Sequence, residues 1–291
     1  MRRNARKEFE MTEKKRVAFQ GEVGAYSEEA IYQFFGDLVE TVPCKTLTDV
    51  FMTVEKGHVD LGLVPVENSL EGSIVRTYDL FLESNLKICG ETILRVVHCL
   101  ISNPSTDLPS VKTVYSHPQA LGQSRKYLEA LALEAIASYD TAGSVKMIKE
   151  KKLLDSAAIA GERAAKFYGM KILAKGIETN HNNYTRFFII GEKDSEATGH
   201  DKTSIAFSAK HAPGALFHAL QIFAVRQINL AKIESRPIIN KPWEYNFYLD
   251  LEGHRSDENV KEALNALRES STFSKILGSY PRAKEYALRN K

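Results

Sequence analysis

Residues 61–69, LGLVPVENS, contain a pattern that recurs along the first two thirds of the chain. Residues 61–66 form a nearly continuous apolar run of strand length, which Pro65 interrupts towards its end. Three polar residues end the run, and the apolar spacing after them predicts an amphipathic helix. One side of this helix carries Ile74, Val75, Tyr78, Phe81 and Leu82. A buried strand, a polar turn and an amphipathic helix in succession are typical of α/β proteins.

Three further units have the same order of strand, turn and helix. The predicted strands are Arg16–Gln20, Val111–Tyr115 and Ala157–Ala160. The first of the helices that follow has Ser27 as its expected cap, and the second has Pro118 at its first position. Strands that alternate with helices predict βαβ units and largely parallel sheets. The length of this region favours two small α/β lobes over one large sheet.

The last third of the chain has a different order of elements. Residues 191–202 contain no large apolar side chain and mark the boundary. After it we expect a strand, a helix, two strands, a helix and a strand, at Thr203–Ser208, Pro213–Arg226, Asn229–Ser235, Tyr245–Leu251, Asp257–Ser270 and Phe273–Leu277. The order βαββαβ is that of the α+β ferredoxin-like fold.

The composition is that of a globular protein without a strong charge bias. The chain has 291 residues, of which 43% are hydrophobic, and 39 basic side chains stand against 37 acidic ones. This balance argues against nucleic-acid binding, and no apolar run has the length of a membrane span. Three cysteines in no paired spacing predict reduced thiols in a cytoplasmic protein, with neither disulfides nor a zinc site. Residues 1–15 lack the apolar core of a signal peptide, and we expect them to form a disordered tail.

Three polar clusters stand where ligands bind in α/β proteins, at the carboxyl ends of strands that face helix N-termini, and a fourth stands immediately before the apolar run Phe187–Ile190. They are residues 67–69, Ser116 with Gln123, Asp140 with Thr141, and residues 182–186. Helix N-termini favour anions by roughly 0.3–1 kcal/mol each. Several that converge on one cleft, together with Arg186, would form a site for a ligand with carboxylate groups.

Each cluster also has a purely structural interpretation. Ser69, Ser116 and Thr141 are suited to cap helices. Glu67 could be an exposed carboxylate without a specific role, and residues 182–185 could form an ordinary polar turn. The individual clusters therefore leave both interpretations open.

Taken together and in this order, the motifs resemble those of the prephenate dehydratase family. The motifs of the first two thirds are GEVGAYS at residues 21–27, VPVENSLEG at 64–72, SHPQAL at 116–121 and NYTRF at 183–187. In the last third, PGAL at 213–216 and IESRP at 233–237 resemble the two effector motifs of that family's ACT domain, and LGSYP at 277–281 also fits. The likeness covers residues 16–281. Gly122 and Ser124 are departures, because they stand where the family more often has Ala and Cys.

The resemblance implies an α/β catalytic region of two lobes, hinged like a periplasmic binding protein, and a C-terminal ferredoxin-like ACT domain. The catalytic region would be residues 16–192, with one lobe of residues 16–95 and 178–192 and the other of residues 96–177. A linker of residues 193–202, an ACT domain of residues 203–281 and a tail of residues 282–291 complete the expected organisation. No chorismate mutase helix or nucleotide-binding fingerprint is visible, so we expect a monofunctional chain.

The activity that the resemblance implies is the conversion of prephenate to phenylpyruvate, water and carbon dioxide, a hydro-lyase reaction without a cofactor or metal. The threonine of the family's TRF motif, here Thr185, would donate a hydrogen bond to the departing hydroxyl. A threonine is a weak acid, so Glu67 would assist it if burial raised the pKa of this carboxyl. The other implied catalytic and substrate-binding positions are Ser116, Gln123, Asn68, Ser69, Thr141, Asn183, Arg186 and Phe187. Arg186 could instead form a structural ion pair across the lobes.

The ACT resemblance implies inhibition by phenylalanine. The implied effector-binding positions are Gly214, Ala215, Leu216, Glu234, Ser235, Arg236 and Pro237. ACT domains usually pair across chains, so a homodimer or homotetramer is expected.

Three other functions agree with the same residues. Arogenate dehydratase acts on a substrate that has an amino group in place of the side-chain keto group of prephenate. The others are a non-catalytic two-lobed ligand-binding protein and an amino-acid-sensing regulator that uses only the C-terminal domain. A turnover assay with prephenate would distinguish the last two from an enzyme.

Overall fold

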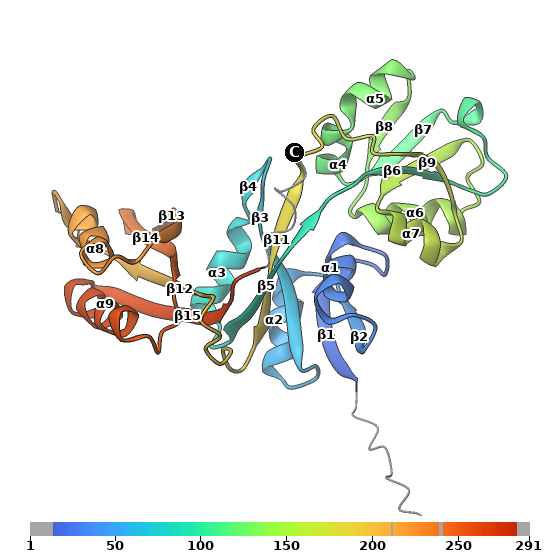
Figure 1. Ribbon diagram of the computed structural model, residues 1–291. Coiled ribbons are helices and arrows are strands. Elements are labelled where there is room, and N and C mark those ends of the chain that lie inside the picture. Colours follow the sequence, from blue (N-terminus) through green and yellow to red (C-terminus); the bar gives the residue numbers. More distant parts are fainter. Residues whose placement is uncertain (1–13, 211, 239–240, 284–291) are drawn as a thin grey trace, which may run out of the picture.

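Three β-sheets, one for each part of the chain, form the framework of the computed structural model (Figure 1). The structure describes residues 14–210, 212–238 and 241–283, so most of the two expected tails, residues 1–15 and 282–291, lies outside the described residues. The predicted fold class, two α/β lobes and a ferredoxin-like domain, is confirmed. Within the described ranges, no helix is both long enough and apolar enough to cross a membrane.

The first lobe contains a mixed sheet with the strand order β2-β1-β3-β11-β5. Its elements are β1 (Lys15–Gln20), α1 (Tyr26–Phe35), β2 (Val39–Cys44), α2 (Leu47–Glu55), β3 (Leu61–Asn68), β4 (Gly72–Ser73), α3 (Val75–Glu83), β5 (Lys87–Arg95) and, much later in the chain, β11 (Tyr184–Gly191). Strand β1 is parallel to β2 and β3, whereas β11 is antiparallel to β3 and β5. The short strand β4 forms a hairpin with β3.

The second lobe contains a sheet with the strand order β10-β6-β9-β7-β8. Its elements are β6 (Cys99–Ser102), η1 (Leu108–Ser110), β7 (Thr113–Ser116), α4 (Pro118–Gln123), α5 (Arg125–Ala130), β8 (Glu134–Ala137), α6 (Thr141–Glu150), β9 (Ser156–Ala160), α7 (Glu162–Tyr168) and β10 (Lys171–Lys175). Strand β7 is parallel to β8 and β9, but β6 is antiparallel to β9 and β10. The prediction of largely parallel sheets is therefore only partly right. The chain crosses between the lobes and returns, and the returning strand β11 enters the first sheet in the opposite direction.

Two crossover segments connect the lobes, one after β5 and one after β10. The Val96 N–H donates to the Asn183 carbonyl at 2.8 Å, and the His98 carbonyl accepts from the Gly176 N–H at 2.9 Å. The backbone N–H of His98 donates to the buried carboxylate of Glu178 at 2.9 Å. The crossovers are thus bonded to each other and form a double-stranded hinge.

The third domain contains an antiparallel sheet with the strand order β13-β14-β12-β15. Its elements are β12 (Asp201–Ser208), α8 (Ala215–Ala224), β13 (Leu230–Ile238), β14 (Lys241–Glu252), α9 (Glu258–Ser270) and β15 (Phe273–Pro281), in the predicted order βαββαβ. Helices α8 and α9 cover one face of this sheet, and the other face is turned towards the first lobe (Figure 1). On that face Tyr248, Leu277 and Tyr280 share a hydrophobic core with Val64 and Phe188 of the first lobe.

Two local features differ from those predicted. Ser27 lies inside α1 and does not cap it, because the N-cap residue is Ala25. Strand β12 begins at Asp201, inside the expected linker. The Asp201 carboxylate accepts from the backbone N–H groups of Thr198 and Gly199, at 2.7 and 2.9 Å, and so fixes the start of the strand.

Strand β15 lies directly against β5, and this close approach depends on Gly278. A Cβ at Gly278 would lie 2.2 Å from the carbonyl oxygen of Ile88 and 2.6 Å from its nitrogen. Backbone atoms cannot yield as a flexible side chain can, so any side chain at this position must separate the third sheet from the first lobe. Gly122 in α4 is the opposite case, because a Cβ built there has no heavy atom within 4 Å.

We expect Gly278→Ala to lower the free energy of unfolding by about 3 kcal/mol, as overpacking of a well-packed contact does. The matched variant Gly122→Ala should raise it by about 0.5–1 kcal/mol, because alanine is favoured over glycine in a helix. Equilibrium unfolding in urea measures both. Equal stabilities of Gly278→Ala and the wild type would contradict the close approach of β15 to β5.

Candidate active site

A cavity of about 370 Å³ lies between the two lobes, beside the hinge. Its size is in the range typical of small-molecule sites. The walls come from α1, β3 and the β3–β4 hairpin on one side, from α4 and α6 on the other, and from the crossovers and β11 between them. The lining residues are Tyr26, Ser27, Pro65, Asn68, Glu71, Gly72, Ser73, Ile74, Val96, His98, His117, Gln119, Ala120, Gln123, Thr141, Thr185 and Phe187.

Two helices of ten residues begin at the cavity, and an N-terminus without a side-chain cap favours a negatively charged ligand. Ser27 lies in the first turn of α1, and Thr141 is the first residue of α6. The N-cap of α1, Ala25, has no side-chain oxygen to occupy the N–H groups of the first turn, which leaves them for a ligand. Helix α6 is capped by Asp140, which accepts from the Gly143 N–H at 2.8 Å. The described residues that line the cavity include no Lys or Arg, so helix termini and neutral donors would have to bind an anion.

A chain of hydrogen bonds along the cavity wall fixes the direction in which Thr185 can donate. The backbone N–H groups of Leu70 and Glu71 donate to Asn68 Oδ1 at 3.0 and 3.2 Å. Since backbone N–H groups can only donate, the amide nitrogen of Asn68 must point the other way, where it donates to Thr185 Oγ1 at 3.0 Å and to Asn183 Oδ1 at 2.8 Å. Thr185 Oγ1 is thus an acceptor from Asn68, and its own proton is directed to an acceptor elsewhere. The cavity is where such an acceptor can be bound.

The chain of hydrogen bonds continues into the second lobe through Gln123 of α4. Asn183 Nδ2 donates to Gln123 Oε1 at 2.8 Å. Gln123 Nε2 then faces the Glu71 carboxylate of the β3–β4 hairpin at 3.4 Å. Because these residues come from both lobes and from the hinge, the relative position of the lobes determines the shape of the site.

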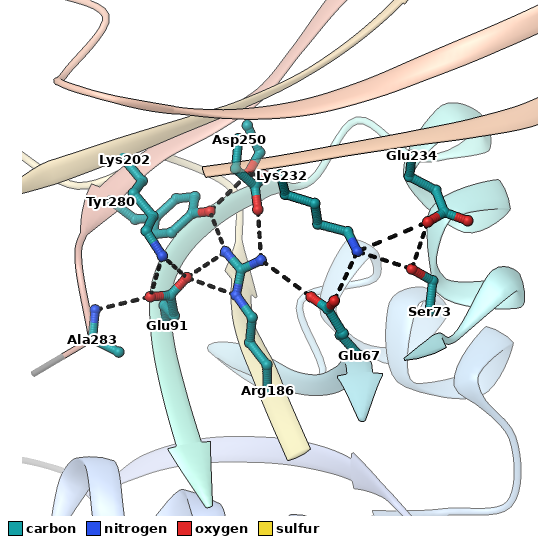
Figure 2. Close-up of polar contacts among 11 residues, drawn as sticks. Glu67, Ser73, Glu91, Arg186, Lys202, Lys232, Glu234, Asp250, Tyr280 and Ala283 are labelled. Atoms are coloured by element: carbon teal, nitrogen blue, oxygen red, sulfur yellow. Dashed lines mark hydrogen bonds and ion pairs between the residues drawn. The ribbon is translucent and has the colours of Figure 1, made fainter. Parts of the chain in front are cut away.

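Arg186, the neighbour of Thr185 on β11, points to the opposite face of the sheet, towards the third domain (Figure 2). It forms ion pairs with Glu91 of β5 and with Asp250 of β14, and its side chain is only 11% exposed. Lys202 of β12 adds a second cation, 3.0 Å from Glu91. Burial alone would lower the pKa of Arg186, but the charges of Asp250 and Glu91 raise it, so the guanidinium remains charged. Arg186 therefore joins the first lobe to the third domain.

Glu67, the neighbour of Asn68 on β3, points to the same interface. Figure 2 shows its carboxylate between Arg186 and Lys232 of β13, and the distance to Lys232 Nζ is 3.1 Å. Lys232 also donates to Ser73 Oγ of β4 at 2.9 Å, and Ser73 in turn donates to Glu234 of β13 at 2.8 Å. The β3–β4 hairpin thus has the cavity on one side and charged groups of β13 on the other.

Five predicted site residues line the cavity together: Asn68, Gln123, Thr141, Thr185 and Phe187. Asn183, which is fully buried, lies behind them and bonds to both Asn68 and Gln123. Residues from four separate segments of the chain therefore meet at one site.

The hydroxyls of Ser116 and Ser69 form hydrogen bonds with the backbone outside the cavity. Ser116 is fully buried at the end of β7, and its hydroxyl donates to the Ile159 carbonyl at 2.6 Å. Ser69 donates to the Asn182 carbonyl at 2.8 Å and accepts from the Tyr184 N–H, so it holds the β3–β4 hairpin to the second crossover. Neither hydroxyl caps a helix or lines the cavity, because backbone partners at strand ends occupy both.

The expected approach of Glu67 to Thr185 is not observed, and Arg186 does not line the cavity. Successive side chains of a strand point to opposite faces of the sheet. Asn68 and Thr185 face the cavity, so the residues adjacent to them in sequence, Glu67 and Arg186, face the third domain. Arg186 forms ion pairs, as the alternative expected, but they join the first lobe to the third domain and do not run across the two lobes.

Twelve of the lining residues were not predicted as site residues, among them Tyr26, Ser27, Glu71 and His98. The first three lie within the motifs at residues 21–27 and 64–72, so those motifs contained the signal. His98 belongs to no such motif. A histidine within the otherwise apolar run from Val96 to Ile101 was the only sequence signal for it.

The predicted effector motif at the start of α8 lies beside a second, smaller cavity. Gly214 is the N-cap of α8 and has a φ of 77°, a conformation that favours glycine. The next two residues, Ala215 and Leu216, line a cavity of about 150 Å³. Trp243, which is 76% exposed, lines the same cavity.

The predicted effector residues of β13 are divided between the two faces of the third sheet. Glu234 and Arg236 share one face, as expected from their spacing, and Glu234 contacts Ser73 of the first lobe. Ser235 and Pro237 lie on the other face and are exposed, because β13 is the edge strand of its sheet.

Metal-binding groups are not gathered at the cavity. Within the described ranges, no three His, Cys, Asp or Glu side chains are arranged to hold a metal ion. The three cysteines are unpaired. Both ring nitrogens of His98 are already hydrogen-bonded, to Gln123 and to Tyr26.

Two family models match the chain. The model described as prephenate dehydratase matches residues 17–195, and the model described as ACT domain matches residues 203–269. A bifunctional chorismate mutase/prephenate dehydratase from Aquifex aeolicus is 42% identical over 94% of this chain and 75% of its own length. An arogenate dehydratase/prephenate dehydratase from Arabidopsis thaliana, named as chloroplastic, is 45% identical over 91% of this chain and 72% of its own length.

Two solved structures resemble nearly the whole chain. Prephenate dehydratase from Arthrobacter aurescens, in complex with L-Phe, has a TM-score of 0.84 and 31% identity, over 92% of this chain and 90% of that one. A protein described as a novel type of quorum quenching acylase has a TM-score of 0.86 and 32% identity, over 94% of this chain and 99% of that one.

Proposed function

The chain belongs to the prephenate dehydratase family, and we propose that the cavity between its lobes binds prephenate and converts it to phenylpyruvate, water and carbon dioxide. The enzyme is thus a carbon–oxygen lyase. The observation that carries the proposal is the environment of Thr185, whose hydroxyl accepts from Asn68 and is left to donate into a cavity where two helices begin.

The cavity is suited to a dianion with an apolar ring. Prephenate has two carboxylates and a ring hydroxyl para to the carbon that loses carbon dioxide. The N-terminus of α1 at Ser27, the Thr141 hydroxyl and the Gln123 amide are the proposed carboxylate partners. Phe187 lines the same cavity and offers an apolar surface to the ring.

The reaction breaks two bonds that join substituents to ring carbons, one to the carboxylate and one to the hydroxyl. It requires no external electrons. As the bond to the departing carboxylate breaks, its electron pair enters the ring, and the ring expels the para hydroxyl. Thr185 donates a hydrogen bond to this oxygen as it leaves, and the proton that completes the water molecule comes from solvent. Assistance of this kind contributes typically 10²–10⁴ in rate, and aromatisation supplies the driving force. Glu67 has no part in this scheme, because its carboxylate faces Lys232.

Arogenate is the second candidate substrate. It differs from prephenate by an ammonium group in place of the keto group. Glu71 is the carboxylate residue that lines the cavity, and it could pair with this ammonium. The relative from Arabidopsis thaliana carries both activities in its name, so the preference of this chain is decided only by direct comparison.

Acyl hydrolysis is less well supported by the site. A threonine nucleophile needs a base that accepts its proton. The described neighbour of Thr185 Oγ1 is the Asn68 amide nitrogen, which donates to it and cannot act as a base. The nearby imidazole of His98 has both nitrogens engaged.

Phenylalanine is the proposed inhibitor, bound at the start of α8. The cavity beside Ala215 and Leu216 is small and is also lined by Trp243 and Tyr245 of β14, while β13 is an edge strand of the same sheet. Pairing of the third domain with a second copy through β13 would cover this edge. A homodimer or homotetramer, in the cytoplasm, is accordingly part of the proposal.

The contacts of β13 suggest how binding of the effector at the third domain would change the catalytic cavity. Glu234 lies in the effector motif and accepts from Ser73, which also lines the catalytic cavity. Lys232 connects the same strand to Glu67 and to Ser73. A shift of β13 would thus act on the β3–β4 hairpin directly and move Asn68 and its partner Thr185.

Conversion of prephenate by the purified chain, followed as phenylpyruvate, tests the function. We expect turnover without added metal or cofactor and a decrease when phenylalanine is added. Rates on prephenate and arogenate measured side by side determine the preferred substrate. A protein that binds prephenate without converting it, and does not convert arogenate, would be a binding protein and not this enzyme.

Replacement of the Thr185 hydroxyl tests the mechanism. Thr185→Val keeps the shape of the side chain but removes the donor, so we expect kcat to fall by about 10²–10⁴ with a much smaller change in KM. Thr185→Ser keeps the hydroxyl and should retain most of the activity. Near-normal turnover by the valine variant would exclude the assigned role.

Removal of the cation between β13 and the hairpin tests the regulatory path. We expect Lys232→Met to bind phenylalanine normally in calorimetry but to be inhibited less completely, because β13 has lost its contact with Glu67. Gly214→Val should instead lose phenylalanine binding, since valine is strained at the φ of 77°. Lys261→Met, on the exposed face of α9, is the control. Full inhibition of Lys232→Met would rule out this path.

A further inference from the structure

His98 lies where the two lobes and the hinge meet, and it is only 2% exposed. Its ring contacts one side chain from each lobe. His98 Nε2 lies 2.8 Å from Gln123 Oε1 of α4, in the second lobe. His98 Nδ1 lies 2.7 Å from the hydroxyl of Tyr26, the first residue of α1 in the first lobe.

The directions of the surrounding hydrogen bonds determine which nitrogen of His98 carries the proton. The chain that begins at the backbone N–H groups of Leu70 and Glu71 requires Asn183 to present its amide nitrogen to Gln123. The group of Gln123 that faces both Asn183 and His98 is therefore the oxygen. An oxygen can bond to His98 only if Nε2 carries a hydrogen.

The protonation state of the other ring nitrogen, Nδ1, follows from that of Nε2. Burial lowers the pKa of His98, so the ring is neutral and Nδ1 has no hydrogen. Nδ1 can then only accept, and the Tyr26 hydroxyl must donate to it. The Val97 carbonyl, 3.0 Å from the same hydroxyl, is a second acceptor. Burial also raises the pKa of Tyr26, which keeps its proton.

We propose that His98 is a positioning residue for the reaction, which as its neutral Nε2–H tautomer turns the Gln123 amide nitrogen into the cavity and ties both lobes to the hinge. This proposal rests on the function proposed above. With His98 and Asn183 both donating to its oxygen, Gln123 cannot flip without placing its NH₂ group against two donors. Its nitrogen remains directed at the cavity, where the 3.4 Å contact with Glu71 is long enough for a ligand carboxylate to replace it.

The role requires a side chain that donates on one end and accepts on the other. Glutamine can place an N–H near the position of Nε2 and an oxygen near Tyr26, so His98→Gln retains both functions. Asparagine is shorter and cannot reach Gln123. His254 provides a control, because it is also buried and bonded through both nitrogens, to Ser256 and Ser195, but lies in the third domain.

Steady-state kinetics of these variants with prephenate and arogenate test the proposal. We expect His98→Asn to lose roughly tenfold or more in kcat/KM, because it removes a buried hydrogen bond to Gln123, the proposed partner of the ligand carboxylate. His98→Gln should remain within about threefold of the wild type, and His254→Gln should leave kcat/KM unchanged. Wild-type values for His98→Asn, or equal losses for the asparagine and glutamine variants, would overturn the proposal. Absence of turnover by the wild type would instead refute the proposed function.

Nitrogen-15 NMR of the histidine rings gives a second readout that does not depend on activity or on the folding of a variant. The signal that disappears in His98→Gln identifies His98. We expect the pattern of a neutral ring with Nε2 protonated and Nδ1 unprotonated, and we expect it to persist below pH 6.5, the usual pKa of histidine. A ring with Nδ1 protonated, or an imidazolium at neutral pH, would contradict the assignment.

Discussion

The ion pairs of Arg186 hold strand β11 between two parts of the protein. A guanidinium that is 11% exposed is costly unless carboxylates neutralise it, and removal of one partner from a buried pair typically costs about 3–5 kcal/mol. Glu91 comes from the first lobe and Asp250 from the third domain, so the charge of Arg186 is satisfied only when both are in place. Because Arg186 is fixed on one face of β11, Thr185 must point to the other face, into the cavity.

Strand β3 repeats this arrangement beside β11. Asn68 faces the cavity and bonds to Thr185, while Glu67 faces Lys232 of the third domain. In the proposed function, the residue that faces the cavity and the residue that contacts the third domain are therefore adjacent along each of two neighbouring strands. The path proposed for regulation from the domain interface to the cavity therefore needs no long series of intermediate contacts.

The sequence was informative where periodicity or motif was strong and failed where the face of a strand had to be known. Apolar runs located several of the strands, and the order of elements predicted all three parts of the fold. In Glu67-Asn68 and Thr185-Arg186, however, two polar residues are adjacent, and nothing local states which one faces the ligand. Residues 67–69 do not begin a helix as expected, because the β3–β4 hairpin lies between them and α3. Strand β11 is antiparallel to its neighbours because the chain returns from the second lobe, and no local sequence pattern indicates this return.

In the proposed mechanism the cavity binds prephenate through the N-terminus of α1 and neutral donors, and this has a consequence for release of the product. A lysine or arginine would attract a dianion strongly but would hold the remaining carboxylate of the product almost as firmly. Helix N-termini contribute roughly 0.3–1 kcal/mol each, so affinity for the dianion is the sum of several weak terms. Decarboxylation removes one charged group together with its terms, and the departing hydroxyl removes the acceptor of Thr185. The product therefore loses interactions at both ends of the ring, and the bond changes of the reaction themselves favour its release.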